Sequence, residues 1–263
     1  MERAKEILKK YYGYDDFRYG QRELIKSILQ GNDTLGIMPT GAGKSICYQV
    51  PALILPGVTL VISPLISLMK DQVDNLNELG IPSAFINSTL TSKRFYEIIN
   101  NAINNRYKLI YIAPERLETQ SFINILNKIN ISMISIDEAH CVSQWGHDFR
   151  KSYTKIADII SMIEKRPIIS AFTATATEKV EQDIINLLKL KDPFRLVTGF
   201  DRENLFFSVE KIENKKDYIV NYIEENKENS GIIYCSTRKS VDMLYEKLSK
   251  LGYKVTSYHA GMR

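Results

Sequence analysis

Two short segments of the sequence carry residue types that handle phosphate groups. The first is Met38-Pro-Thr-Gly-Ala-Gly-Lys-Ser45, which follows an apolar run and begins a helical pattern. Glycines let backbone N–H groups point inward at phosphate oxygens, and the N-terminus of the next helix favours negative charge. In such a loop Lys44 would reach the β- and γ-phosphates and Ser45 would bind Mg²⁺. The residues expected to line the phosphates are Pro39, Thr40, Gly41, Ala42 and Gly43.

The strict phosphate-loop pattern has a glycine at the position of Met38, so only its TGAGKS core is present. A glycine-rich turn with a solvated lysine is the simpler alternative. The strand–loop–helix context favours the phosphate loop over that alternative.

The second segment is Met133-Ile-Ser-Ile-Asp-Glu-Ala-His140, which ends an apolar run with adjacent carboxylates. A phosphate-loop enzyme needs an acid at the end of a neighbouring strand to hold Mg²⁺, and Asp137 fits this role. Glu138 could polarise the attacking water, and His140 could link the site to another ligand by hydrogen bonding. Alone, the pair could be a solvated Asp-Glu at a strand end. Its combination with TGAGKS favours a catalytic site for ATP.

The elements that must position these segments alternate between short apolar runs and amphipathic stretches. Expected strands span residues 34–38, 58–62, 83–86, 108–112, 133–136 and 168–172. Expected helices span residues 45–55, 65–79, 92–105, 121–128 and 178–188. The runs lack strict alternation, which suits strands covered on both faces, as in a parallel sheet flanked by helices. The sequence therefore predicts an α/β fold.

The same pattern restarts near residue 204. Strands are expected at 205–209, 231–235 and 253–258, and helices at 215–225 and 238–251. We therefore expect one domain over residues 1–203 and the beginning of a second over 204–263. A parallel α/β domain of about 60 residues would bury too little surface to be stable alone, so the second domain is expected to be incomplete.

The composition is that of an ordinary globular chain. Lys plus Arg is 35 and Asp plus Glu is 31 among 263 residues, a net charge of +4 that permits a polyanionic partner without requiring one. The three cysteines form no CxxC pair, so no zinc site or disulfide framework is expected. No apolar run approaches the length of a membrane span. A cytoplasmic location and no membrane contact are expected.

Taken together, the motifs resemble those of a known family. GAGKS, Asp137-Glu-Ala-His140 and Phe172-Thr-Ala-Thr-Ala-Thr177 look like a superfamily 2 helicase. Tyr14-Asp-Asp-Phe-Arg-Tyr-Gly-Gln21 and Cys141-Val-Ser-Gln-Trp-Gly-His-Asp-Phe-Arg150 narrow the resemblance to the RecQ family of DNA helicases. Ser63-Pro-Leu-Ile-Ser-Leu-Met-Lys-Asp-Gln72 and Tyr111-Ile-Ala-Pro-Glu-Arg-Leu117 also follow the family pattern. The resemblance implies that both domains are RecA-like.

The resemblance also implies residue roles that make chemical sense. Gln21 would hydrogen-bond an adenine edge, since its amide carries both a donor and an acceptor. Tyr14 could stack on the base, and Arg18 could lie near it. The residues expected to contact DNA or couple it to hydrolysis are Ser63, Trp145, His147, Phe149, Arg150, Thr173, Thr175, Arg238 and His259. Trp145, His147, Phe149 and Arg150 form an aromatic-rich loop suited to stacking on unpaired bases.

We therefore expect an ATP- and Mg²⁺-dependent 3′–5′ DNA helicase. It would translocate along single-stranded DNA and unwind branched duplexes in repair and recombination, as a nucleoid-associated monomer whose protein partners the sequence does not identify. The family's arginine finger has no match here, and Arg263 should not be given that role, so this chain alone should bind nucleotide but hydrolyse it poorly.

Three alternatives stay open. One is an RNA helicase of the same superfamily, against which the QWGHDFR segment argues. Another is an ATP-gated DNA-binding module without hydrolysis. The third is a phosphate-loop kinase, which would leave the helicase-like motifs unexplained.

Overall fold

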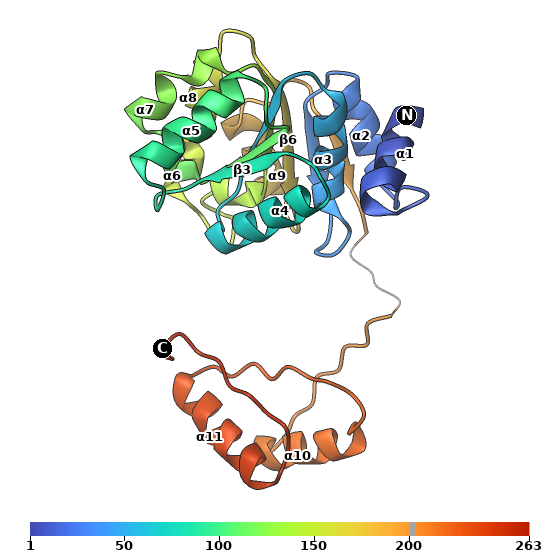
Figure 1. Cartoon of the computed structure of the whole chain (residues 1–263). Helices are drawn as coiled ribbons and strands as arrows, with labels where there is room; N and C mark the ends of the chain where they lie inside the picture. Colours follow the sequence, from blue (N-terminus) through green and yellow to red (C-terminus); the bar gives the residue numbers. More distant parts are fainter. Residues whose placement is uncertain (200–203, 263) are drawn as a thin grey trace. The chain divides into compact units, whose positions relative to one another are not determined.

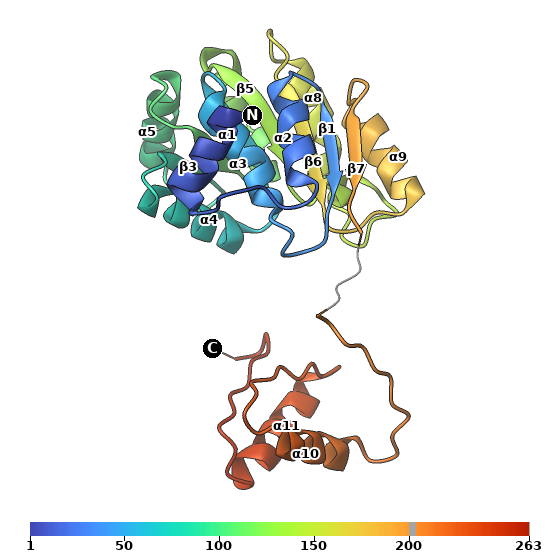
Figure 2. The same ribbon diagram turned by 90° about the vertical axis from the view of Figure 1, so that its right-hand side faces the viewer.

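The structure is a computed structural model that describes residues 1–199 and 204–262 (Figures 1 and 2). The chain divides into two compact units, Met1–Asp201 and Arg202–Arg263. Each unit is described by itself. No helix in the described part of the chain is both long and apolar enough to cross a membrane.

A seven-stranded parallel sheet forms the centre of the first unit, in the order β3-β4-β2-β5-β6-β1-β7. Its strands are β1 (Thr34–Ile37), β2 (Val58–Ile62), β3 (Ser83–Ile86), β4 (Leu109–Ile112), β5 (Ile131–Ile136), β6 (Ile168–Thr173) and β7 (Phe194–Val197). The α/β fold with a parallel sheet flanked by helices is confirmed, and all six expected strands of this unit are present.

Helices cover both faces of this sheet (Figures 1 and 2). Those that pack on one face are α2 (Gln21–Leu29), α3 (Lys44–Ile54) and α4 (Ile66–Glu78). Those that pack on the other are α5 (Ser92–Ile103), α8 (Ile156–Ser161) and α9 (Glu178–Leu187). In β2, Val61 contributes to the first layer while Leu60 and Ile62 contribute to the second. Burial on both faces explains why the strand sequences are apolar without alternation.

Shorter elements complete the first unit. They are α1 (Glu2–Ile7), the π-helical segment η1 (Leu8–Tyr12), α6 (Pro114–Leu117), α7 (Gln120–Ile123), and the 3₁₀ segments η2 (Leu126–Lys128), η3 (Ala139–Val142) and η4 (Lys151–Lys155). The single helix expected over residues 121–128 is therefore wrong: α7 and η2 are separate turns. Phe122 and Leu126 are both buried, and core packing of these two side chains takes precedence over a continuous helix.

The second unit contains α10 (Lys215–Glu225) and α11 (Arg238–Lys250), as expected. The strands expected at 205–209, 231–235 and 253–258 are wrong, because no strand is formed within residues 204–262. A strand needs hydrogen-bonding neighbours as well as an apolar pattern. Most side chains of these three segments are exposed, including those of Phe206 and Tyr234. The identity of this unit as part of a second RecA-like domain stays a prediction.

Candidate functional site

The glycine-rich loop joins the end of β1 to the start of α3. Gly41 and Gly43 have φ values of 83° and 81°, in the left-handed region that favours glycine. A Cβ added at Gly43 would lie 2.4 Å from Gln21 Nε2, so a side chain there would clash. Lys44 Nζ donates to the Met38 carbonyl over 3.1 Å, which holds the ammonium group over the loop. The first expected segment thus has the backbone geometry of a phosphate loop.

Gln21 and Arg18 brace this loop from the N-terminal segment. The Gln21 side chain accepts from Arg18 N over 2.9 Å and donates to Ala42 O and Gly43 O over 3.1 and 3.2 Å. Arg18 Nη1 donates to Gly41 O over 2.7 Å. The donor and acceptor of Gln21 therefore both bond to this chain's backbone. Its contact with an adenine edge stays a prediction, whereas its bond to the loop is a role that the motif alone did not reveal.

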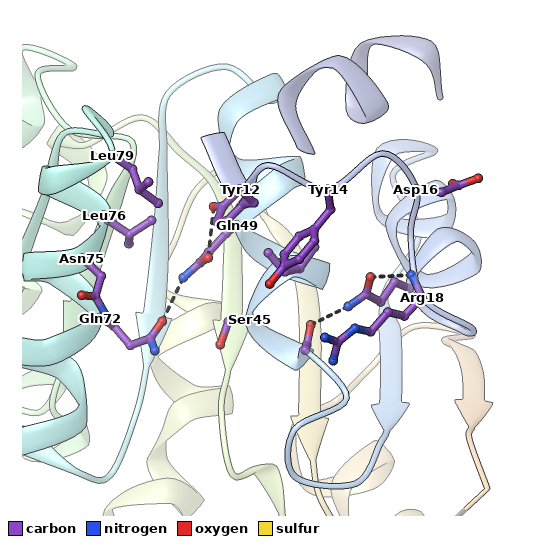
Figure 3. Close-up of a pocket in the computed structure, with 13 residues that line it drawn as sticks. Tyr12, Tyr14, Asp16, Arg18, Ser45, Gln49, Gln72, Asn75, Leu76 and Leu79 are labelled. Carbon is purple, nitrogen blue, oxygen red and sulfur yellow. Dashed lines mark hydrogen bonds between the residues drawn. The ribbon is translucent and has the colours of Figure 1, made fainter. Parts of the chain in front are cut away.

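A cavity of about 310 Å³ lies beside the loop (Figure 3). Tyr14, Arg18 and Gln21 line it together with Gly43 and Ser45. The three residues expected to contact a base thus share one cavity with Gly43 and Ser45, two of the residues expected at the phosphates. This arrangement could hold a nucleotide with its phosphates at the N-terminus of α3.

The Asp-Glu pair lies at the carboxyl end of β5, at the same sheet edge as the loop. Burial and the neighbouring Glu138 raise the pKa of Asp137 to about 6, and the nearby Lys44 ammonium partly opposes this shift. The charges of Asp137 and Lys44 are therefore close enough to act on each other. Glu138 has a φ of 47°, which is uncommon for a residue with a side chain, and its N–H donates to Asp137 Oδ1 over 3.0 Å.

His140 connects the acidic pair to the end of β6. Its Nδ1 lies 3.3 Å from Glu138 Oε2 and 2.8 Å from Thr173 Oγ1. The Thr173 carbonyl in turn accepts from Met38 N over 3.0 Å, at the start of the glycine-rich loop. Burial, helped by His147, lowers the pKa of His140 to about 4, so the imidazole is neutral at pH 7. These contacts join the two phosphate-handling segments through Thr173.

Magnesium would find hard oxygen donors here. Ser45 and Asp137 supply a hydroxyl and a carboxylate, and burial together with the neighbouring Glu138 disfavours the Asp137 anion, which a bound cation would stabilise. No group of three or more His, Cys, Asp or Glu side chains within residues 1–199 and 204–262 could hold a metal by itself. Mg²⁺ keeps waters and phosphate oxygens among its ligands, so the two oxygen donors of Ser45 and Asp137 would be enough protein ligands for it. The residues present fit this ion.

The aromatic-rich loop at residues 141–150 follows the acidic pair directly. Trp145 is 68% exposed and Phe149 is also exposed, while the His147 ring stacks on His140 at 3.9 Å. Arg150 donates to the Pro64 carbonyl over 3.1 Å, next to the buried Ser63. Available aromatic faces thus occur on a loop that contacts the DEAH histidine. Lys179, which the sequence gave no reason to select, lies 3.4 Å above the Trp145 ring.

The remaining expected residues are spread over both units. Thr173 is buried at the end of β6 and its hydroxyl donates to the Thr175 carbonyl over 3.3 Å, whereas Thr175 itself is exposed. Arg238 begins α11, and His259 Nε2 lies 3.0 Å from Asp242 Oδ1. These two residues belong to the second unit and are described only within it. Their role in gripping DNA stays a prediction.

Sequence comparison identifies the family. The profile of the DEAD/DEAH box helicase family matches residues 18–184, which is more than half of the chain. The RecQ ATP-dependent DNA helicase of Bacillus subtilis is 49% identical over 263 residues, covering 100% of this chain and 44% of the relative. The RecQ helicase of Haemophilus influenzae is 44% identical, covering 98% of this chain and 42% of the relative. The chain thus spans less than half the length of these relatives.

Solved structures agree on the fold. The helicase MrfA bound to DNA gives a TM-score of 0.72 at 18% identity, covering 95% of this chain and 38% of that one. Mycobacterium smegmatis Lhr bound to single-stranded DNA and AMP-PNP gives 0.66 at 16% identity, covering 96% and 37%. The chain belongs to the DEAD/DEAH box helicase family, and the relatives it resembles at high identity within that family are RecQ helicases.

Proposed function

We propose that this chain binds Mg·ATP and forms the nucleotide-binding part of an ATP-dependent DNA helicase of RecQ type. One observation carries the proposal: the glycine-rich loop, the cavity lined by Tyr14, Arg18 and Gln21, and the Asp137–Glu138 pair meet at one edge of the sheet. The names of the RecQ relatives support DNA as the substrate. Movement in the 3′–5′ direction on single-stranded DNA, and unwinding of branched duplexes in repair and recombination, are part of the proposal.

Each phosphate-handling residue has a distinct task. Lys44 and the loop amides bind the triphosphate, and Glu138 orients and deprotonates the attacking water. Ser45 and Asp137 would hold Mg²⁺, which when bound neutralises charge on the phosphate oxygens. Neutral His140 lies between Glu138 and Thr173 and contacts both, so it links the acidic pair to the end of β6. Trp145 and Phe149 offer stacking faces for unpaired bases.

The test is the substitution Lys44→Ala. We expect the affinity of the 263-residue chain for ATP to fall by more than about 10-fold, because the ammonium charge is lost where the phosphates bind. Calorimetric titration with ATP measures this, and Lys93→Ala, at an exposed position of α5, is the matched control. Unchanged affinity in a folded Lys44→Ala variant would reject the phosphate-loop assignment.

The nucleic-acid substrate is tested separately. Strand displacement is measured on DNA and RNA duplexes of matched sequence, with a protein that contains this whole chain. We expect it to displace the DNA strand faster. Equal or better displacement of RNA would favour an RNA helicase of the same superfamily.

A further inference from the structure

Gln72 on α4 presents a hydrogen-bond donor to the nucleotide cavity. Its Oε1 accepts from Gln49 Nε2 over 3.0 Å, and both residues line the cavity. Figure 3 shows the amide nitrogen of Gln72 turned away from Gln49. Within the described residues, this nitrogen makes no hydrogen bond to the protein. The Gln72 side chain is half-buried where it lines the cavity.

A chain of buried hydrogen bonds holds Gln72 in this orientation. Tyr12 donates to Gln49 Oε1 over 3.1 Å, and Gln49 Nε2 also donates to the Tyr111 hydroxyl over 3.1 Å. Gln49 is almost fully buried and lies one helical turn after Ser45 on α3. The contacts therefore connect the N-terminal segment, α3, β4 and α4 around the cavity wall. Such a supported side chain is pre-organised for binding.

The neighbours of Gln72 indicate which part of a nucleotide it would meet. Leu76 lies on the same helix and Leu79 is its C-cap residue, and both line the cavity. Two leucine side chains beside the carboxamides of Gln72 and Asn75 suit a base or a ribose better than a triphosphate. The phosphates have their own partners at the glycine-rich loop and Lys44.

We infer that Gln72 donates a hydrogen bond to an acceptor atom on the nucleoside part of ATP, and that Gln49 positions it. This inference rests on the proposed function, because it requires ATP in the cavity. Gln72 is then a specificity-determining contact contributed by the helix that follows the Ser63–Pro64 turn. Since Arg150 of the aromatic-rich loop contacts Pro64, one helix would join the nucleoside contact to the segment expected to meet DNA.

Two substitutions separate a ligand contact from a purely structural role. Gln72→Glu keeps an oxygen that can accept from Gln49 but removes the N–H donors, whereas Gln72→Met removes both. We expect each to raise the Kd for ADP by about 3- to 10-fold, measured by calorimetric titration of the 263-residue chain with magnesium present. In Gln72→Glu the new carboxylate would also repel the phosphates of ADP. Titration with uncharged adenosine removes this repulsion, and the affinity of the variant should still be lower than that of the wild-type chain. The matched control is Glu78→Gln, which alters the same helix outside the cavity.

Nucleotide analogues identify the acceptor. If Gln72 bonds to the ribose, the wild-type chain should discriminate against 2′- or 3′-deoxy-ADP and Gln72→Glu should not. If Gln72 bonds to the base, the wild-type chain should bind a deaza-adenine nucleoside diphosphate more weakly than ADP, and Gln72→Glu should bind the two equally. Wild-type affinity of Gln72→Glu for ADP and adenosine, with folding verified by thermal unfolding, would overturn the inference and leave the proposed function standing. A folded wild-type chain that binds no nucleotide would overturn both.

Discussion

Apolar side chains are buried in the unit Met1–Asp201 and largely exposed in the unit Arg202–Arg263. In the first unit, seven strands pair with one another and helices cover both faces of the sheet. Among the described residues of the second unit, only Leu244 and Leu248 are buried hydrophobic residues, both on α11. The difference teaches that an apolar run becomes a strand only where neighbouring strands satisfy its backbone. The cavity of the candidate site is correspondingly lined by residues of the first unit.

Limited proteolysis should give the largest difference between the units. Phe206 and Phe207 are 92% and 85% exposed, whereas Phe172 is fully buried in β6. Cleavage at Phe172 requires opening of the sheet, so we expect chymotrypsin to cut after Phe206 or Phe207 at least about 1,000-fold faster. Mass spectrometry of timed digests measures the rates. Similar rates at Phe172 and Phe206 would show that the first unit is not a stable core.

Substitution of Asp33 should give the next largest effect. This nearly buried carboxylate lies 2.5 Å from Arg166 Nη2 and accepts from Ile169 N and Lys191 N over 3.0 and 2.7 Å. It thus ties the start of β1 to β6 and to the segment before β7. Asp33→Ala leaves these donors unpaired, so the free energy of unfolding should fall by about 3–5 kcal/mol, measured by chemical denaturation.

The matched variant is Lys247→Ala in the second unit. Lys247 Nζ lies 2.7 Å from Asp217 Oδ1, but this pair is solvent-exposed, so its loss should cost about 1 kcal/mol or less. Comparable losses for both variants would contradict the contrast between a buried and an exposed ion pair.

Substitution of Asp137 should stabilise the first unit while impairing its chemistry. Burial raises the pKa of Asp137 to about 6, so the folded state holds this proton more tightly than the unfolded state. The ionised Asp137 side chain therefore lowers the free energy of unfolding above about pH 6, and this destabilisation disappears as the pH falls towards 4. Asp137→Asn should therefore increase the free energy of unfolding by about 1–2 kcal/mol at pH 7, with little difference near pH 4. Magnesium-dependent ATP binding should be lost.

Thermal unfolding at pH 7, 5 and 4 measures this effect. Asp148→Asn is the control. The hydrogen bond from Arg150 lowers the pKa of the Asp148 carboxyl, so this substitution should destabilise the fold at pH 7 where Asp137→Asn stabilises it. A destabilised Asp137→Asn variant at pH 7 would mean that the carboxylate has favourable partners which outweigh its desolvation.

The sequence predicted the layers of the first unit well because its strands are buried on both faces. Strand β7 was not predicted, because it pairs only with β1 and its Phe194 and Arg195 are exposed, so it lacks the buried apolar run of the other strands. At the candidate site, the backbone geometry of the glycine-rich loop could be predicted because its motif is contiguous, while the functional roles of its residues stay predictions. The bonds of Gln21 to that loop, and the Tyr12–Gln49–Gln72 contacts, join segments far apart in sequence. Their partners follow from the packing of α3 against α4 and the N-terminal segment, which local patterns do not encode.

The smallest expected effect is that of Leu248→Ala in α11. Leu248 is only 2% exposed, yet its unit buries one other apolar residue among those described, so water can fill the space that the substitution leaves. The cost of a large-to-small substitution depends on the cavity that remains, and here it should be about 1 kcal/mol or less. Ile184→Ala in α9, within the extensive core on one face of the sheet, should instead cost about 2–5 kcal/mol.

Chemical denaturation followed by circular dichroism compares the two variants, with Leu251→Ala at an exposed position as control. An effect of Leu248→Ala as large as that of Ile184→Ala would show that Leu248 belongs to a closed core, and the contrast between the two units would fail.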